Sequence, residues 1–176
     1  YTDTGDLDAV RENARRNVAD LLPFVDEGAK IVVPGPSCSL LIKNEYPKLL
    51  GTDDARRVAD ATVDLMEHLF ALGKAKLLNR DFAQPLGTVA YHAPCHLRAQ
   101  NVGFPSRALL KAAGAEVVLV DACSGVDGTW GMQARFHDAS MQVASKMLER
   151  IEAAEPDHVA TECPLSALRI EEGTGR

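Results

Sequence analysis

Short apolar runs rich in β-branched residues alternate along the chain with longer segments in which apolar residues recur every three or four positions. The short runs predict strands, at residues 30–33, 88–91, 116–120 and 158–161. The periodic segments predict amphipathic helices, at residues 6–22, 38–50, 52–72, 106–113, 137–154 and 164–172. Strands that alternate with helices predict an α/β fold with a mainly parallel sheet and flanking helices.

The order of these elements repeats along the chain. Residues 88–172 have the pattern of one β-α-β-α-β-α unit, and residues 6–72 have the pattern of the end of a similar unit. The stretch between them has no clear periodicity and ends in Pro-Leu-Gly at 85–87, which favours a boundary there. We therefore expect two parts: residues 1–80, the end of a first cysteine-rich repeat, and residues 81–176, a complete second repeat.

Each of the four cysteines follows a predicted strand by a few residues and precedes a predicted helix. They are Cys38, Cys95, Cys123 and Cys163. In a parallel α/β sheet all strand-to-helix turns lie at one edge of the sheet, where ligands bind. Cysteines that are far apart in the sequence can therefore meet at one place.

Thiolates at neighbouring strand ends repel one another unless they are protonated or bind a cation. Three of them, Cys95, Cys123 and Cys163, would select zinc or an iron–sulfur cluster over magnesium or calcium. Besides a molecule from solution, the candidates for a fourth ligand are Cys38, His92, His96 and the hydroxyls of Ser124 and Ser166. The spacing alone is equally compatible with four cysteines that pack as small buried hydrophobic residues.

The most glycine-rich stretch of the chain, residues 122–131, directly follows the third predicted strand. Its glycines allow the backbone to turn sharply around Cys123 and to approach a bulky group closely. The stretch lacks the lysine of a P-loop and departs from the spacing of a dinucleotide-binding loop. It is therefore better explained as a loop around a cluster, with Gly125 among the cofactor-binding residues, than as a phosphate site.

Composition and charge narrow the class of protein. The 176 residues are enough to bury a core, and 46% hydrophobic with 25% charged residues is typical of a soluble globular domain. The net charge of −6 argues against a nucleic-acid-binding face and a polybasic membrane anchor, and no apolar run approaches the ~20 residues of a transmembrane helix. The chain opens at Tyr1 without a methionine, so we expect a fragment of a longer protein. The cysteine spacing favours a reducing, cytoplasmic compartment over disulfides.

Three stretches around the cysteines resemble a known family. Residues 91–97 (YHAPCHL), 123–131 (CSGVDGTWG) and 161–166 (TECPLS) resemble the cysteine-rich "CCG" domain. This domain occurs in the heterodisulfide reductase subunit designated B, in the iron–sulfur subunits of glycolate and lactate oxidases, and in the anaerobic glycerol-3-phosphate dehydrogenase subunit designated C. Residues 37–39 (SCS) and 43–47 (KNEYP) look most like the end of the first repeat of the glycerol-3-phosphate dehydrogenase subunit.

The resemblance implies an iron–sulfur domain that relays electrons, without catalysing a reaction itself, from a flavoprotein dehydrogenase subunit to a quinone or disulfide acceptor. Other iron–sulfur subunits are the implied further partners. Cys95, Cys123 and Cys163 match the ligand positions of the second repeat, and Cys38 matches the last ligand of the preceding repeat. The implied location is the cytoplasm, including the inner face of the cell membrane through peripheral association.

The chain departs from the family pattern at two positions. The paired cysteines of the family are Cys123-Ser124 here, and its terminal Cys-x-x-Cys ends in Ser166. A five-thiolate cluster is therefore not expected, whereas a [4Fe–4S] cluster with three thiolates and one other ligand agrees with the residues present; His96 is the better histidine for that position.

Two other function classes compete with the electron-transfer hypothesis. One is a redox-silent module, with zinc or without metal, that docks partner subunits. The other is a thiol enzyme that uses a cysteine of low pKa. Metal content and colour distinguish the first from an iron–sulfur protein, and rapid alkylation of one cysteine in metal-free protein is the mark of the second.

Overall fold

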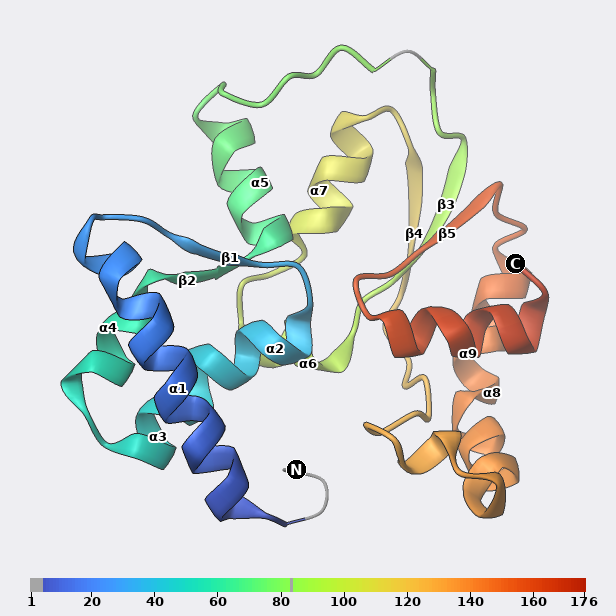
Figure 1. Cartoon of the computed structure of the whole chain (residues 1–176). Helices are drawn as coiled ribbons and strands as arrows, with labels where there is room; N and C mark the ends of the chain where they lie inside the picture. Colours follow the sequence, from blue (N-terminus) through green and yellow to red (C-terminus); the bar gives the residue numbers. More distant parts are fainter. Residues whose placement is uncertain (1–4, 83) are drawn as a thin grey trace. The chain divides into compact units, whose positions relative to one another are not determined.

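A computed structural model describes residues 5–82 and 84–176 (Figure 1). The chain divides after His68 into two compact units, and each contains parallel strands with helices beside them. The predicted α/β class with a mainly parallel sheet and flanking helices is confirmed. The assignment of residues 1–80 and 81–176 to two successive repeats stays a prediction.

The first unit is built on a pair of parallel strands. Its elements are α1 (Leu7–Asp26), β1 (Ile31–Val33), α2 (Pro36–Leu40), the π-helix η2 (Leu41–Glu45), α3 (Tyr46–Leu50), α4 (Asp53–Ala61) and β2 (Thr62–Asp64). In the register of the pair, Ile31 lies opposite Thr62 and Val33 opposite Asp64. The core of this unit consists of buried side chains from α1, α3 and α4, namely Ala14, Val18, Tyr46, Ala55 and Val58.

The helix predicted over residues 52–72 is wrong in its middle. The chain leaves the helix after Ala61, forms strand β2, and becomes helical again in α5 (Leu65–Lys74). Thr62 and Val63 are β-branched, and their backbone groups pair with those of β1, which a reading of local periodicity does not include. The Thr62 hydroxyl donates to the Val58 carbonyl at 2.7 Å and so caps the end of α4.

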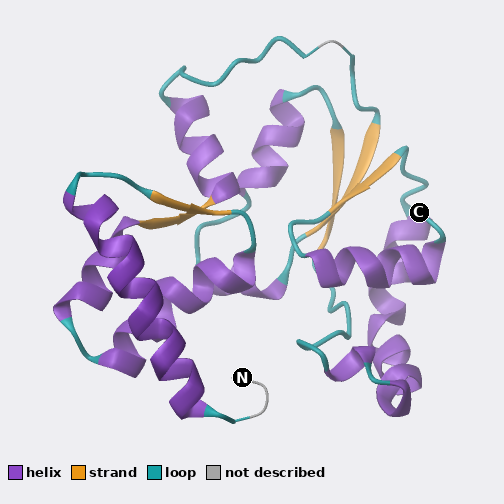
Figure 2. Ribbon diagram, in the orientation of Figure 1, coloured by secondary structure: helices purple, strands orange, loops and turns teal. Residues whose placement is uncertain are grey.

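The second unit contains a three-stranded parallel sheet, drawn in orange in Figure 2. After α5 its elements are β3 (Thr88–His92), α6 (Cys95–Ala99), α7 (Pro105–Ala112), β4 (Glu116–Val120), the 3₁₀-helices η3 (Trp130–Met132) and η4 (Ala134–Phe136), α8 (His137–Ala153), β5 (His158–Ala160) and α9 (Pro164–Thr174). The strand order is β4-β3-β5, and Tyr91 of the central strand lies opposite Leu119 on one side and Ala160 on the other.

Strand β3 is buried on both faces of this sheet. Its last four residues, 89–92, are each at most 2% exposed. Successive side chains of a strand point to opposite faces, so Ala90 lies on one face and Tyr91 on the other. The face of Ala90 packs with Met147 and Ile151 of α8 and Ile170 of α9, and α7 packs against β4. The central strand is thus packed on both faces up to the edge where the cysteines follow the strands.

Candidate metal centre at the carboxyl edge of the sheet

Three cysteines follow three neighbouring strands at the same distance in sequence. Cys95, Cys123 and Cys163 each come three residues after the last residue of β3, β4 and β5, respectively. Because the three strands are parallel and adjacent, their carboxyl ends lie at the same edge of the sheet. The sequence-based expectation that the strand ends bring these cysteines to one edge agrees with this topology.

The surroundings of Cys95 include the charges of the other two thiols. The pKa of the Cys95 thiol is raised above its ordinary value, chiefly by desolvation and further by the charges of Cys123 and Cys163. A hydrogen bond from the His96 backbone acts in the opposite direction and lowers this pKa. By surface area Cys95 and Cys123 are exposed and Cys163 is half-buried, and none is in a disulfide. The raised pKa of Cys95 is compatible with surface exposure because surrounding protein still displaces part of the water around its sulfur.

The glycine loop after β4 holds Cys123. The Gly125 N–H donates to the Cys123 Sγ at 3.3 Å. Gly125 has φ of +71°, and a Cβ at this position would overlap the backbone carbonyl of Ser140 at the start of α8. Glycine is therefore required for the loop to turn back on the helix and direct an amide at the sulfur.

His92, at the end of the central strand, ties together the segments that follow the other two strands. Its side chain is 2% exposed; Nε2 lies 3.1 Å from the Ala122 carbonyl oxygen and Nδ1 lies 3.1 Å from the Thr161 hydroxyl. A carbonyl only accepts, so Nε2 carries the proton and Nδ1 accepts from the threonine. Burial lowers the pKa of His92, which keeps the ring neutral. Both ring nitrogens are used within the protein, so His92 is a structural bridge in this structure.

The segment after β5 is fixed by a second set of polar contacts. The Tyr91 hydroxyl donates to the Glu162 carboxylate at 2.8 Å, and the Ser106 hydroxyl donates to the same oxygen. The Cys163 N–H donates to the Thr161 hydroxyl at 3.4 Å. Glu162 is partly buried, and the two hydroxyls that bond to it come from β3 and α7. They anchor the turn that carries Cys163.

The other candidate metal ligands differ in burial and in their contacts. Ser166 is 3% exposed and donates to the Ser124 hydroxyl at 3.1 Å, so the two serines that depart from the family pattern are in contact with each other. The His96 side chain is exposed, beside Cys95 at the start of α6. Cys38 lies on α2 in the first unit and is exposed. The assignment of Cys38 and His96 as metal ligands stays a prediction.

Two cavities open beside Cys123. The first has a volume of about 310 Å³, and residues that line it include Cys95, Cys123, Gly125, Arg98 and Trp130. The second, of about 320 Å³, lies between Cys123 and the α8 side chains Val143, Lys146 and Arg150. The indole of Trp130 stacks on Phe136 with ring centroids 5.0 Å apart and is partly buried at the cavity wall. The chain's single tryptophan therefore reports on this site.

The residues present fit a soft metal or an iron–sulfur cluster by their chemistry. Three thiols at one edge are soft donors, an amide N–H is directed at one sulfur, and a cavity borders two of the three thiols. As the side chains stand, no three His, Cys, Asp or Glu within residues 5–82 and 84–176 form a group that could hold a metal ion.

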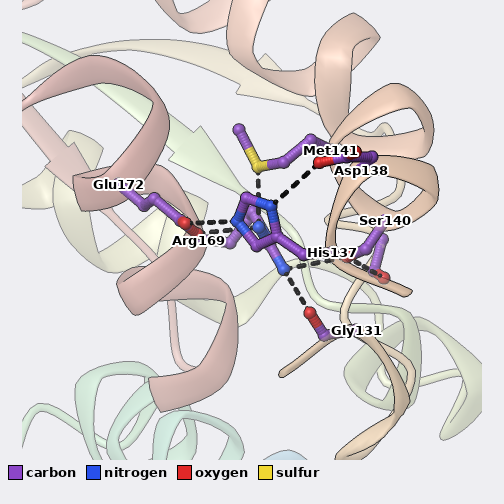
Figure 3. A network of polar contacts seen from close by, with 8 residues as sticks. Gly131, His137, Asp138, Ser140, Met141, Arg169 and Glu172 are labelled. Atoms are coloured by element: carbon purple, nitrogen blue, oxygen red, sulfur yellow. Dashed lines mark hydrogen bonds and ion pairs between the residues drawn. The ribbon is translucent and has the colours of Figure 1, made fainter. Parts of the chain in front are cut away.

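A buried arginine behind the glycine loop was missed by sequence reasoning (Figure 3). Arg169 of α9 is 2% exposed, and its guanidinium donates to the Gly131 carbonyl and to the Ser140 hydroxyl, each at 2.8 Å. It also reaches the Met141 sulfur at 2.6 Å and the Glu172 carboxylate at 2.7 Å. The only local signal in the sequence is the pairing of Arg169 with Glu172 three residues later.

At the outer end of this network, Glu172 also binds His137. The His137 Nε2 donates to a Glu172 oxygen at 2.6 Å. This bond raises the pKa of His137 and lowers the pKa of Glu172. Both side chains are exposed, so the pair caps the surface end of a network whose other end is buried.

Comparison with known proteins finds a matching family model and similar relatives. Residues 89–170 match the family model "CCG: Cysteine-rich domain". The chain is 29% identical over 179 residues to the subunit designated D of the dihydromethanophenazine:CoB–CoM heterodisulfide reductase of Methanosarcina mazei, covering 94% of this chain and 40% of that protein. It is 26% identical over 157 residues to the EtfAB:quinone oxidoreductase of Syntrophomonas wolfei, covering 82% of this chain and 21% of that protein.

The chain thus spans less than half the length of these two curated relatives. No solved structure gives a significant match. In the part of the chain that the structure describes, no helix combines the length and the apolar content needed to cross a membrane.

Proposed function

Because residues 89–170 match the family model of the cysteine-rich CCG domain, we propose that the chain is an electron-transfer part of an oxidoreductase, with an iron–sulfur cluster bound by Cys95, Cys123 and Cys163. The observation that carries the proposal is the equal offset of these cysteines from the ends of three adjacent parallel strands. The names of two relatives, a heterodisulfide reductase subunit and a quinone oxidoreductase, support an oxidoreductase-related role.

A cluster bound here would supply reversible one-electron transfer. The protein's own residues have three tasks around it. The Gly125 N–H donates to the Cys123 sulfur, and hydrogen bonds to sulfur tune the reduction potential of such centres. His92, neutral and bonded on both nitrogens, holds the segments that follow β4 and β5 in register. Trp130, at the cavity wall, limits the access of water.

The finer features of the proposal follow from the family resemblance and the donor set. The cluster is a [4Fe–4S] centre whose fourth ligand is His96, a hydroxyl of the Ser124–Ser166 pair, or an exogenous group. Its electrons come from a flavoprotein dehydrogenase subunit, pass through other iron–sulfur subunits, and reach a quinone or disulfide acceptor. The protein acts in the cytoplasm, at the inner face of the membrane when its acceptor is a quinone.

The test is anaerobic reconstitution of the 176-residue chain with iron and sulfide, followed by iron and sulfide analysis, a visible absorption spectrum and dithionite titration. We expect a brown protein that dithionite bleaches, with quenched Trp130 fluorescence. Cys95→Ala, Cys123→Ala and Cys163→Ala should each lose most of the iron while keeping the far-ultraviolet circular dichroism of the wild type. Cys38→Ala tests the fourth ligand separately: loss of iron would assign Cys38 to the cluster, and full iron content would leave the other candidates.

Other outcomes assign other functions. A colourless chain with about one zinc bound through the same three cysteines would replace electron transfer by a redox-silent docking module. If Cys123→Ala kept the full absorbance of the wild type, the ligand assignment would be wrong. Rapid stoichiometric alkylation of one cysteine in a chain that binds neither metal would point to a thiol enzyme.

A further inference from the structure

We propose that Arg169 is a positioning residue for Cys123, acting through Ser140 and the Gly125 carbonyl to fix the residue whose N–H bonds to the sulfur. The inference rests on the proposed function, because it assigns a role to residues behind the proposed cluster site. It concerns four connected parts: the Arg169 guanidinium, the Ser140 hydroxyl, residue Gly125 with its carbonyl and its N–H, and the Cys123 sulfur.

The first link is a charge enclosed in protein. The Arg169 side chain is 1% exposed, yet three of its contacts are to neutral groups, namely the Gly131 carbonyl, the Ser140 hydroxyl and the Met141 sulfur. Its Nε is buried with no hydrogen-bond partner. Burying a charge is unfavourable unless polar groups around it compensate. Glu172 pairs with the guanidinium through Nη1, and the loop carbonyl and the helix hydroxyl accept from Nη2.

The second link carries the arrangement to the cysteine. The Ser140 hydroxyl accepts from Arg169 and donates to the Gly125 carbonyl at 2.8 Å. The N–H of Gly125 donates to the Cys123 sulfur. Ser140 thus holds the same glycine whose amide contacts the sulfur, and Arg169 holds the serine and the far end of the loop at Gly131. Ser140 and Arg169 thus bond to the loop at two places, the Gly125 carbonyl and the Gly131 carbonyl.

The loop lies so close to α8 that two of its positions have no room for a side chain. Besides Gly125, Gly131 also has no room for a Cβ, which would overlap the Ser140 hydroxyl and the Gly125 carbonyl. Two glycines of the loop therefore approach the same serine so closely that its hydroxyl is enclosed by backbone. Removing the serine hydroxyl or the guanidinium leaves polar backbone groups of the loop without their buried partners.

A guanidinium suits this position better than an ammonium group. Its planar fork donates in several directions at once, whereas a lysine ammonium is a compact charge on a flexible stem. Arg169→Lys keeps the positive charge but cannot reach the four acceptors together. The substitution therefore separates the charge of residue 169 from its hydrogen-bond geometry. The reduction potential of a nearby centre responds to both, whereas the order of the loop responds to the geometry alone.

The experiment uses the full chain in two states. In the metal-free chain, amide hydrogen exchange is measured for the loop amides of Gly125 and Gly131 and, as an internal reference, for the β3 amides. In the iron-loaded chain, the reduction potential is measured by dye-mediated titration. The variants are Ser140→Ala, Arg169→Lys, Arg169→Gln and Glu172→Gln. Glu172→Gln is the matched control for loop exchange, because it removes the carboxylate charge and leaves the bonds of Arg169 to Gly131 and Ser140 in place.

We expect Ser140→Ala to speed exchange of the loop amides about five- to tenfold relative to β3, the effect of one lost hydrogen bond. Loss of the ordered N–H should also lower the reduction potential of the loaded chain. Arg169→Gln should show both effects, and Arg169→Lys should show the faster exchange with a smaller change of potential. Glu172→Gln should match the wild type in loop exchange, and any shift of its potential measures the effect of charge alone.

If Ser140→Ala sped amide exchange equally in the loop and in β3, Ser140 would only stabilise the fold as a whole, and the inference would be overturned. Unchanged exchange of the loop amides would overturn it as well. If Arg169→Gln does not fold, Ser140→Ala alone decides, since serine and alanine differ by one oxygen. The exchange measurement needs no cluster. A wild-type chain that binds no iron therefore contradicts the proposed function but leaves the role of Arg169 and Ser140 tested separately.

Discussion

Substituting His92 tests how the carboxyl edge of the sheet is held together. In the proposed arrangement the imidazole is a bridge between the segments after β4 and β5 and is not a ligand. The informative change is His92→Leu, which fills a similar space without a hydrogen-bonding group. His92→Gln is the matched control, because its amide N–H can still donate to the Ala122 carbonyl and its oxygen can still accept from Thr161.

The size of the effect follows from the two contacts. Each hydrogen bond contributes about 1 kcal/mol to stability, and a buried carbonyl left without a partner costs about 1–3 kcal/mol more. Ala122 is 8% exposed, so little water can replace the imidazole at its carbonyl. We expect His92→Leu to lower the free energy of unfolding by about 3–5 kcal/mol, and His92→Gln by about 1 kcal/mol.

The same bridge predicts how stability depends on pH. Burial lowers the pKa of His92 in the folded chain, so the unfolded chain binds the proton first as the pH falls. The stabilisation by neutral His92 is complete above the unfolded pKa of about 6.5 and decreases as the pH falls toward the folded pKa, by at most ~1.4 kcal/mol per pH unit. His92→Gln has no such titration, so its stability deficit relative to wild type should shrink between about pH 8 and about pH 5.

Urea unfolding of the metal-free chain, followed by circular dichroism and Trp130 fluorescence at several pH values, provides the assay. If His92→Leu costs less than ~0.5 kcal/mol, as surface substitutions usually do, the two hydrogen bonds do not stabilise the fold. A stability difference between wild type and His92→Gln that stays constant with pH would refute the buried neutral imidazole.

Three further predictions concern the same edge. Gly125→Ala should lower the free energy of unfolding by about 2 kcal/mol or more in urea titrations, because a side chain there combines positive φ with overlap on the Ser140 carbonyl; wild-type stability would contradict the loop conformation. Tyr91→Phe should lower the melting temperature through a loss of about 1.5–3 kcal/mol, because a buried hydroxyl bonded to the Glu162 carboxylate is removed; calorimetry checks this. Removing iron from the reconstituted chain with a chelator should also lower its melting temperature, because a cluster that binds only the folded state stabilises it by mass action, and an unchanged value would argue against a site built on three strand ends.

The elements that carry the cysteines were predictable because their signals are local. Each cysteine of the second unit follows a run of β-branched or apolar residues and precedes a helix start, and the parallel arrangement of such strands follows from their alternation with helices. Strand β2 was not predictable in this way. Thr62–Asp64 lies inside a helical periodicity, and only pairing with β1, thirty-one positions earlier in the register, makes it extended.

The polar framework behind the site was also out of reach of local patterns. Arg169 reads as a surface residue of an amphipathic helix, and its buried partners Gly131 and Ser140 are 38 and 29 residues away in sequence. Val143 is an apolar residue of the predicted helix 137–154, and it is 49% exposed and lines the cavity beside Cys123. Such positions depend on which helix face meets the loop, and that is decided by packing between distant segments.

The strand order of the second unit has a consequence for the time course of folding. The central strand β3 is made first and pairs with β4 after a gap of 28 residues, whereas β5 pairs with β3 across 69 residues, with Val89 opposite His158. Contacts between distant segments form slowly because a long loop must close first. During synthesis Cys95 and Cys123 therefore emerge and gain their positions well before Cys163 does. Until β5 docks, a metal ion would meet only two of the three thiols, so the assembly of the centre depends on the last strand to join the sheet.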